Sequence, residues 1–172
     1  MRALADEDRI RRFLRALGRE ADVNGACYLT GGATAVLVGW RASTIDVDIR
    51  LSPETDALLR AIQRLKDELE LNVELASPAD FIPVPNGWRE RSLFVGREGR
   101  LDYYHFDPYA QALSKLERGH SQDLDDVREL VSRGLVDPLI ARSHFDEIER
   151  ELHRFPAIDP GAFRRRVERE LS

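Results

Sequence analysis

A short run of alternating residues, Ile45-Asp46-Val47-Asp48-Ile49-Arg50-Leu51, constrains the fold more than any other part of the chain. A period of two is typical of a half-buried β-strand, with the four aliphatic residues on one face and Asp46 and Asp48 on the other. Two carboxylates a few ångströms apart repel by about 3 kcal/mol at an effective dielectric near 20. Either water screens them on an exposed strand face, or a divalent cation binds between them.

The segment before this strand has the features of a phosphate-binding turn. Residues 26–30 predict a short buried strand, Gly31-Gly32 a turn, and residues 33–40 a helix rich in small residues. Glycine lets the backbone approach a ligand closely, and N–H groups at the start of a helix favour phosphate, although such turns also contain glycine for steric reasons alone. A phosphate-binding turn followed about 15 residues later by a carboxylate pair for Mg²⁺ is typical of phosphoryl or nucleotidyl transfer.

The rest of the chain predicts a mixed α/β core followed by helices. Apolar spacing predicts a helix over 7–20, and Ser52 with Pro53 predicts the start of a helix that ends near Glu70. Further strands are predicted at 71–75, 92–95 and 100–106, and further helices at 108–118, 121–133, 138–154 and 160–171. We therefore expect an α/β (α+β) core over 1–107, with a small mixed sheet flanked by helices, and a C-terminal helical region over 108–172 packed on it. The proline-rich segment 77–91 predicts a long surface loop.

Composition and charge exclude several classes of protein. The formal net charge of −5 does not favour nucleic acid as a general partner, although a local basic patch for RNA is compatible with it. The single cysteine, Cys27, excludes an internal disulfide and is typical of a reducing compartment. The N-terminus is too charged for a secretory signal, and no apolar run approaches the length of a membrane span. We expect a cytoplasmic protein with no membrane partner.

Several catalytic motifs are absent from the sequence. It contains no G-x-S-x-G elbow, no Walker lysine motif and no G-x-G-x-x-G. The four histidines lack the spacing of a zinc site, and we expect each to be a surface or half-buried residue. The glycine turn and the Asp-x-Asp strand therefore remain as the candidate chemistry.

These two features together resemble the DNA polymerase β-like nucleotidyltransferase superfamily. Gly31-Gly32 followed by Arg41-x-x-Thr44-x-Asp46-x-Asp48 looks like the GG or GS turn and the T-x-D-x-D strand of that superfamily. The chain is similar to its small bacterial members, the AbiEii toxin-related proteins and the DUF6036 group. The segment that runs from Asp102 through Lys115 to Asp126 is similar to the region after the catalytic sheet in those proteins. The resemblance covers residues 26–130 and implies a nucleotidyltransferase fold.

The resemblance implies a role for each residue of the turn and the strand. Gly31 and Gly32 would hold the triphosphate of an NTP through backbone N–H groups. Asp46 and Asp48 would bind a pair of Mg²⁺ or Mn²⁺ ions and would be catalytic. Many members have serine at the second position of the turn, so Gly32 departs from the pattern and removes a hydroxyl contact to phosphate.

The resemblance also implies residues outside the turn and the strand. The third catalytic and metal-binding carboxylate would come from a neighbouring strand, with Asp102 as the first choice and Glu74 as its rival. Lys115 would pair with the charge of the triphosphate, and Arg41 and Thr44 would contact phosphate or brace the strand.

Two further acids lie near the start of a predicted helix. Asp123 and Asp126 are at positions i and i+3 and follow Ser121 closely. Acids in the first turn of a helix interact favourably with its dipole, so a capping role explains Asp123 at least as well as chemistry does.

Three functions are compatible with these features. The first is a Mg²⁺-dependent nucleotidyltransferase whose acceptor, by family analogy, is a tRNA end or a side chain of a partner protein, as in toxin–antitoxin systems. The second is a catalytically inactive binding or antitoxin-like module, with the 77–91 loop and the basic run Arg164-Arg165-Arg166 as its partner surface; that run is equally compatible with a solvated helix face. The third is a transferase for a cationic small molecule, which the acidic balance would suit.

Overall fold

The structure is a computed structural model that describes residues 3–172. The chain divides into two compact units, Met1–Ser77 with Leu93–His105, here called the sheet unit, and Pro78–Ser92 with Phe106–Ser172, here called the helical unit. The sequence-based division joined residues 1–107, whereas the compact units group the 78–92 segment with the helices.

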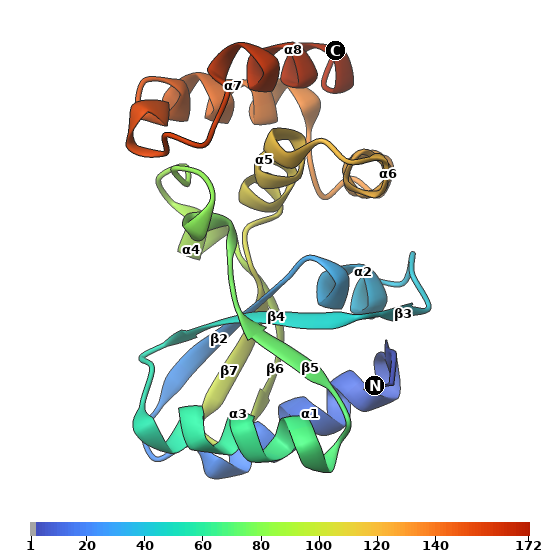
Figure 1. Cartoon of the computed structure of the whole chain (residues 1–172), viewed down its shortest axis with the longest axis vertical. Helices are drawn as coiled ribbons and strands as arrows, with labels where there is room; N and C mark the ends of the chain where they lie inside the picture. The colour runs from blue at the N-terminus through green and yellow to red at the C-terminus, as the bar shows by residue number, and fades with distance from the viewer. Residues whose placement is uncertain (1–2) are drawn as a thin grey trace. The chain divides into compact units, whose positions relative to one another are not determined.

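The sheet unit contains a five-stranded mixed sheet in the order β5-β4-β2-β7-β6 (Figure 1). Its strands are β2 (Gly25–Thr30), β4 (Asp46–Ser52), β5 (Asn72–Leu75), β6 (Leu93–Glu98) and β7 (Leu101–His105). The pairs β2–β4 and β6–β7 are antiparallel, and the pairs β2–β7 and β4–β5 are parallel. A two-stranded sheet joins β1 (Ala5–Asp6) to β3 (Ser43–Thr44). The predicted mixed α/β fold class is confirmed.

Two helices pack side by side against one face of the five-stranded sheet (Figure 1). These are α1 (Glu7–Glu20) and α3 (Asp56–Glu68), and a short helix, α2 (Gly32–Val38), follows β2. The predicted apolar stripe of α1 is fully or almost fully buried, as are four residues of α3 that meet the aliphatic face of the sheet. Burying this apolar surface supplies the driving force that holds β4 in register.

The start of α3 differs from the sequence prediction. Ser52 pairs with Ala26 as the last residue of β4 and does not cap the helix. Thr55 is the N-cap instead, because its hydroxyl accepts a hydrogen bond from the Leu58 N–H at 3.2 Å. Sheet pairing therefore extends β4 past the residue that local capping rules selected.

The helical unit is built from short elements. They are the 3₁₀ turn η1 (Pro78–Asp80), α4 (Trp88–Arg91), α5 (Pro108–Arg118), α6 (Ser121–Ser132), α7 (Pro138–Glu149), the 3₁₀ turn η2 (Leu152–Arg154) and α8 (Pro160–Glu170). Asp137 and Asp159 cap α7 and α8 with proline following, as predicted. The predicted helix 138–154 is wrong at its end, because α7 stops at Glu149 and a 3₁₀ turn buries Leu152. Within residues 3–172 no helix is both long and apolar enough to cross a membrane.

Candidate functional site

Strand β4 presents the two aspartates on one face, as the alternation predicts. Val47 and Ile49 are completely buried, while Asp46 and Asp48 are half-buried on the opposite face. Ile45 was predicted to lie on the buried face, but it precedes the first paired residue of β4 and is 66 % exposed. The aliphatic face packs in the core and holds the strand, so that both carboxylates are presented from one rigid element.

The glycine turn lies directly beside Asp48. Thr30 at the end of β2 pairs with Asp48, so that Gly31 is the next residue along the chain. Gly31 has φ +61°, a left-handed conformation that favours glycine, and a Cβ at this position would lie 3.3 Å from Asp48 Oδ2. The turn and the strand that the sequence singled out are therefore one local site.

Gly32 is fixed by close packing. A Cβ at Gly32 would lie 2.0 Å from Thr44 Oγ1 and 3.2 Å from an Arg41 guanidinium nitrogen. The Thr44 hydroxyl donates a hydrogen bond to the Asp46 carbonyl oxygen at 3.2 Å. Arg41 and Thr44 thus lie against the turn, and Thr44 occupies the space that a serine side chain at position 32 would need.

The register of the sheet separates the two candidates for the third carboxylate. Glu74 on β5 pairs directly with Asp48, so both side chains are on the same face in adjacent strands. Asp102 on β7 pairs with Ala26, whereas Asp48 pairs with Thr30, four residues further along β2. This offset is about 13 Å along the strand.

Asp102 therefore does not converge with the aspartate pair, contrary to the expectation for a third ligand. Its Oδ1 instead accepts a hydrogen bond from Arg97 on the neighbouring strand at 3.0 Å. Within residues 3–172, no group of three or more histidine, cysteine, aspartate or glutamate side chains is arranged to hold a metal ion by itself. Mg²⁺ commonly uses only one or two carboxylates, together with substrate phosphates, so the Asp46–Asp48 pair fits this requirement.

A buried histidine braces the helix that follows the turn. His105 was predicted as a surface or half-buried residue, but it is 8 % exposed, and its Nδ1 lies 3.0 Å from the Thr34 hydroxyl on α2. Burial, with a smaller contribution from the charge of Arg11, lowers the pKa of His105 to about 4. His105 is therefore neutral at pH 7. The sequence carried no local signal for this contact, because 71 residues separate its partners.

Lys115 lies in the helical unit and forms a buried ion pair there. Its Nζ donates a hydrogen bond to Asp126 Oδ2 at 2.7 Å, and both residues are less than 9 % exposed. Asp123 accepts a hydrogen bond from the His120 N–H at 3.2 Å and accepts two from Arg118. Burial raises the pKa of Asp123, but the hydrogen bonds and charge of Arg118 outweigh it, and the net pKa lies below the ordinary value. The proposed capping role of Asp123 is confirmed by its contact with His120.

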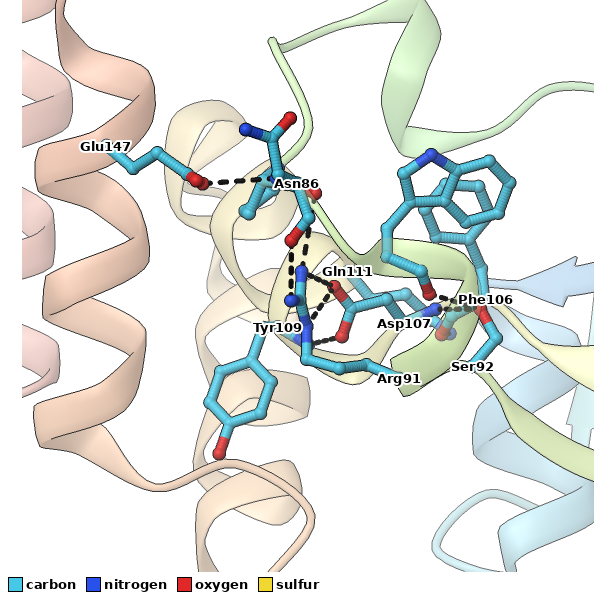
Figure 2. Close-up of polar contacts among 10 residues, drawn as sticks. Asn86, Arg91, Ser92, Phe106, Asp107, Tyr109, Gln111 and Glu147 are labelled. Atoms are coloured by element: carbon cyan, nitrogen blue, oxygen red, sulfur yellow. Dashed lines mark hydrogen bonds and ion pairs between the residues drawn. The ribbon is translucent and has the colours of Figure 1, made fainter.

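A polar network that the sequence did not suggest anchors the 78–92 segment (Figure 2). Arg91 donates two hydrogen bonds to Asp107 Oδ2, at 3.0 and 2.8 Å, and another to the Asn86 carbonyl oxygen. Asp107 also caps α5, and its N–H donates to the Ser92 hydroxyl. The sequence predicted a helix over 108–118, but nothing next to Asp107 in the chain indicates Arg91 or Ser92 as its partners.

The basic run of α8 has intramolecular partners. Arg164 pairs with Glu149 on α7 and with Glu168. Arg166 donates two hydrogen bonds to the Leu116 and Glu117 carbonyl oxygens at the end of α5. Arg164 and Arg166 therefore hold the helical unit together, whereas Arg165 is exposed, as the solvated helix face predicts.

Comparison with known proteins identifies one family. The model of the DUF6036 family, described as a nucleotidyltransferase of unknown function, matches residues 8–154. No curated protein and no solved structure matches the chain. The match includes the glycine turn, strand β4 and the Lys115–Asp126 pair.

Proposed function

The chain belongs to this nucleotidyltransferase family, and from that membership and the site geometry we propose that it transfers a nucleoside monophosphate from an NTP to an acceptor hydroxyl group with the help of Mg²⁺. One observation carries the proposal: the glycine turn lies directly beside Asp48, so that a Cβ added at Gly31 would be 3.3 Å from Asp48 Oδ2. This chemistry requires a backbone that can approach phosphate closely. It also requires carboxylates that can hold a divalent cation.

Each residue of the site has a role in the proposed reaction. The backbone of Gly31 and Gly32 holds the triphosphate, and the Arg41 guanidinium group, which packs against Gly32, donates to phosphate oxygens. Asp46 and Asp48 hold Mg²⁺, or Mn²⁺ in its place, on the polar face of β4. When bound, the cation neutralises charge on the phosphates. Lys115 is left out of these roles, because its ammonium group already pairs with Asp126 in the helical unit.

The bond changes follow from nucleotidyl transfer. The acceptor oxygen forms a bond to the α-phosphorus, the bond from that phosphorus to the bridging oxygen of the β-phosphate breaks, and pyrophosphate leaves. The proton of the acceptor hydroxyl goes to a carboxylate of the polar sheet face. We assign this role to Glu74 and not to Asp102, because Glu74 pairs with Asp48 in register and is exposed to an incoming acceptor.

A labelling experiment tests the proposal. The full chain is incubated with each α-³²P-labelled NTP and Mg²⁺, together with total tRNA in one series and cell lysate protein in another. Asp46→Asn and Asp48→Asn should each lower label transfer by at least about a hundredfold, since a metal-held phosphate accounts for several kcal/mol of transition-state stabilisation. Glu74→Gln should also lower transfer.

Asp102→Asn is the matched control, because Asp102 is on the same sheet and face but about 13 Å along the strands. It should keep transfer within a few-fold of the wild type. If Asp46→Asn and Asp48→Asn label acceptors as well as wild type does, the transfer proposal fails. If no acceptor is labelled but NTP binding depends on Mg²⁺ and on Asp48, the chain is a nucleotide-binding module. The absence of a three-carboxylate cluster in residues 3–172 is the observation that favours this second function.

A further inference from the structure

The solvent face of α1 carries a row of arginines. Arg12, Arg15 and Arg19 follow one another at i, i+3 and i+7, a spacing that places side chains on one face of a helix. All three are exposed, and they lie on the side of α1 opposite the apolar stripe from Ile10 to Leu17, which packs against the sheet. These three residues are here called the arginine row.

The arginine row has no partner within the part of the chain that the structure describes. Among residues 3–172, none of its three side chains makes an ion pair or a hydrogen bond. Two other arginines of α1 differ. Arg9 donates a hydrogen bond to the Leu69 carbonyl oxygen at 2.8 Å. Arg11 pairs with Glu7 at 3.0 Å. The charge of the row, unlike that of Arg9 and Arg11, is therefore available to a partner outside the chain.

Few acids offset this charge on α1. Glu7 and Glu20 each pair with an arginine outside the row. Asp8, one turn before the row, is the acid of α1 that lies on the same face. The face therefore carries three positive charges against one negative charge, although the chain as a whole has a net charge of −5. The excess of positive charge is local to this face.

The neighbouring helix α3 has no such excess. Its exposed charged residues are two arginines and three acids: Arg60, Arg64, Asp56, Asp67 and Glu68. Arg64 pairs with Glu68 at 3.3 Å and with Glu20 of α1 at 2.7 Å. Charges of both signs are mixed on α3, so a binding surface for anions is restricted to the row on α1.

The chemistry of this face favours the phosphate backbone of a nucleic-acid duplex. A membrane-binding helix inserts its apolar face, but the apolar face of α1 is buried against the sheet. Single strands bind through aromatic side chains on which bases stack, and the one aromatic residue of α1, Phe13, is buried. A duplex presents its phosphates outward and needs neither feature.

The length of the row matches the spacing of duplex phosphates. At a rise of about 1.5 Å per residue, the Cα atoms of Arg12 and Arg19 are about 10 Å apart along the helix axis. One strand of a duplex carries a phosphate about every 3.4 Å along its axis, which gives about three phosphates over this length. Guanidinium groups suit phosphate because they can donate two parallel hydrogen bonds at once. Three arginines on one helix can therefore contact successive phosphates of one strand.

We propose that the arginine row binds the phosphate backbone of a nucleic-acid duplex without regard to base sequence. Each guanidinium group donates hydrogen bonds to phosphate oxygens, and no base is contacted. The helix packs against the aliphatic face of the sheet, whereas Asp46 and Asp48 are on the other face. The surface is therefore independent of the proposed transfer site and requires neither Mg²⁺ nor NTP.

Fluorescence anisotropy of a labelled duplex tests the proposal. The full chain is titrated into a duplex of about 20 base pairs, without Mg²⁺ or NTP, at NaCl concentrations from about 50 to 200 mM. Arg12→Ala/Arg15→Ala/Arg19→Ala should lower the affinity at the lowest salt concentration by at least about tenfold, because three contacts that release counterions are lost. Arg15→Ala alone should reduce the slope of log K against log salt by about 0.9. Alanine is the best helix former, so these exposed substitutions keep α1 folded.

A second triple variant controls for the change in net charge. Arg142, Arg150 and Arg165 are exposed arginines of the helical unit, and within residues 3–172 their side chains make no ion pair or hydrogen bond. Arg142→Ala/Arg150→Ala/Arg165→Ala removes the same charge as the triple variant of the row. It should leave duplex binding within a few-fold of the wild type.

Further arms separate the proposal from its alternatives. A variant with all three residues of the row changed to lysine keeps the charge and should bind within a few-fold of the wild type. Duplex RNA and duplex DNA of one sequence, compared in parallel, identify the sugar of the partner, and equal affinity identifies the phosphate backbone alone. Asp46→Asn/Asp48→Asn should bind the duplex at least as well as the wild type, so that failure of the transfer proposal is distinguished from failure of this one.

Three outcomes would overturn the proposal. The first is equal affinity of the two alanine triple variants for the duplex. The second is tighter binding of a single strand of the same sequence than of the duplex. The third is cosedimentation with vesicles of anionic lipid that depends on the arginine row while the duplex is not bound.

Discussion

Buried ionisable side chains are charged and paired in the helical unit, whereas they are neutral in the sheet unit. In the helical unit, buried acids are paired with cations: Asp126 with Lys115 at 2.7 Å and Asp107 with Arg91 at 2.8 Å. In the sheet unit, burial raises the pKa of Cys27 above its ordinary range and lowers that of His105 to about 4, so both groups are neutral at pH 7. Buried ion pairs therefore stabilise the helical unit, whereas Cys27 and His105 are buried in the sheet unit without charge.

Asp46 and Asp48 stand out against this pattern. They are half-buried acids on one strand face of the unit that otherwise keeps its interior neutral. Among residues 3–172, Asp46 makes no ion pair with a basic side chain. Two acids on one strand face, beside a turn built from two required glycines, are consistent with a ligand site.

The largest expected effect follows from breaking the buried pair of the helical unit. Lys115→Met leaves Asp126 as a buried charge without its ammonium partner, and this should lower the free energy of unfolding of the helical unit by about 3–5 kcal/mol. The chain has two tryptophans, Trp40 in the sheet unit and Trp88 in the helical unit. Urea unfolding followed by Trp88 fluorescence in a Trp40→Phe background reports on the helical unit.

The double variant Lys115→Met/Asp126→Leu controls for the loss of charge itself. Replacing a buried ion pair by apolar side chains of similar volume is often neutral or stabilising, so the double variant should be more stable than Lys115→Met. A single variant as stable as wild type would show that the pair does not hold α5 and α6 together.

The second effect concerns the neutral histidine of the sheet unit. The pKa of His105 is lowered from 6.5 to about 4 by burial first and by Arg11 second. Between these two values the unfolded chain binds a proton that the folded chain does not, so stability should fall as the pH decreases from 6.5 to 4 and level off below 4. The loss should be on the order of 3 kcal/mol.

His105→Gln isolates this contribution, because it keeps a polar contact to Thr34 but cannot titrate. Urea unfolding of the sheet unit, followed by Trp40 fluorescence in a Trp88→Phe background, is measured from pH 7.5 to pH 4 for both proteins. The difference between wild type and His105→Gln should decrease steadily over this window. A constant difference would mean that His105 is not held neutral by the fold.

How much of this organisation the sequence predicts depends on how local each interaction is. The alternation of β4 and the glycine turn are local patterns, and from them the shared face of Asp46 and Asp48 and the turn at Gly31 were predicted correctly. The distance of Asp102 from this pair was not predicted, because it is set by the pairing of β7 with β2, which are far apart in the chain. The register that pairs Glu74 with Asp48 cannot be predicted from the pattern of a single strand either.

The same limit explains the misassigned charges. Lys115 and Asp126 were each recognised as motif residues, but their mutual contact depends on the packing of α5 against α6. The arginines of α8 were interpreted as an exposed run, since nothing in residues 160–171 alone indicates Glu149 or the end of α5 as their partners. Whether a charged side chain forms an intramolecular ion pair or remains available to a ligand depends on contacts between residues that are far apart in the sequence.

The smallest expected effect concerns Asp46 and provides the sharpest contrast with Lys115. Asp46→Asn removes a half-buried charge that makes no ion pair within residues 3–172 and that repels Asp48 on the same face. The free energy of unfolding of the sheet unit should therefore change by no more than about 0.5 kcal/mol, or increase slightly, in the absence of divalent cations. The measurement is urea unfolding followed by Trp40 fluorescence at pH 7.5.

Adding Mg²⁺ should stabilise the wild type and leave Asp46→Asn unchanged, because only a cation that binds the folded state shifts the equilibrium. A loss of several kcal/mol in the variant without Mg²⁺ would instead mean that Asp46 supports the fold, as Lys115 does.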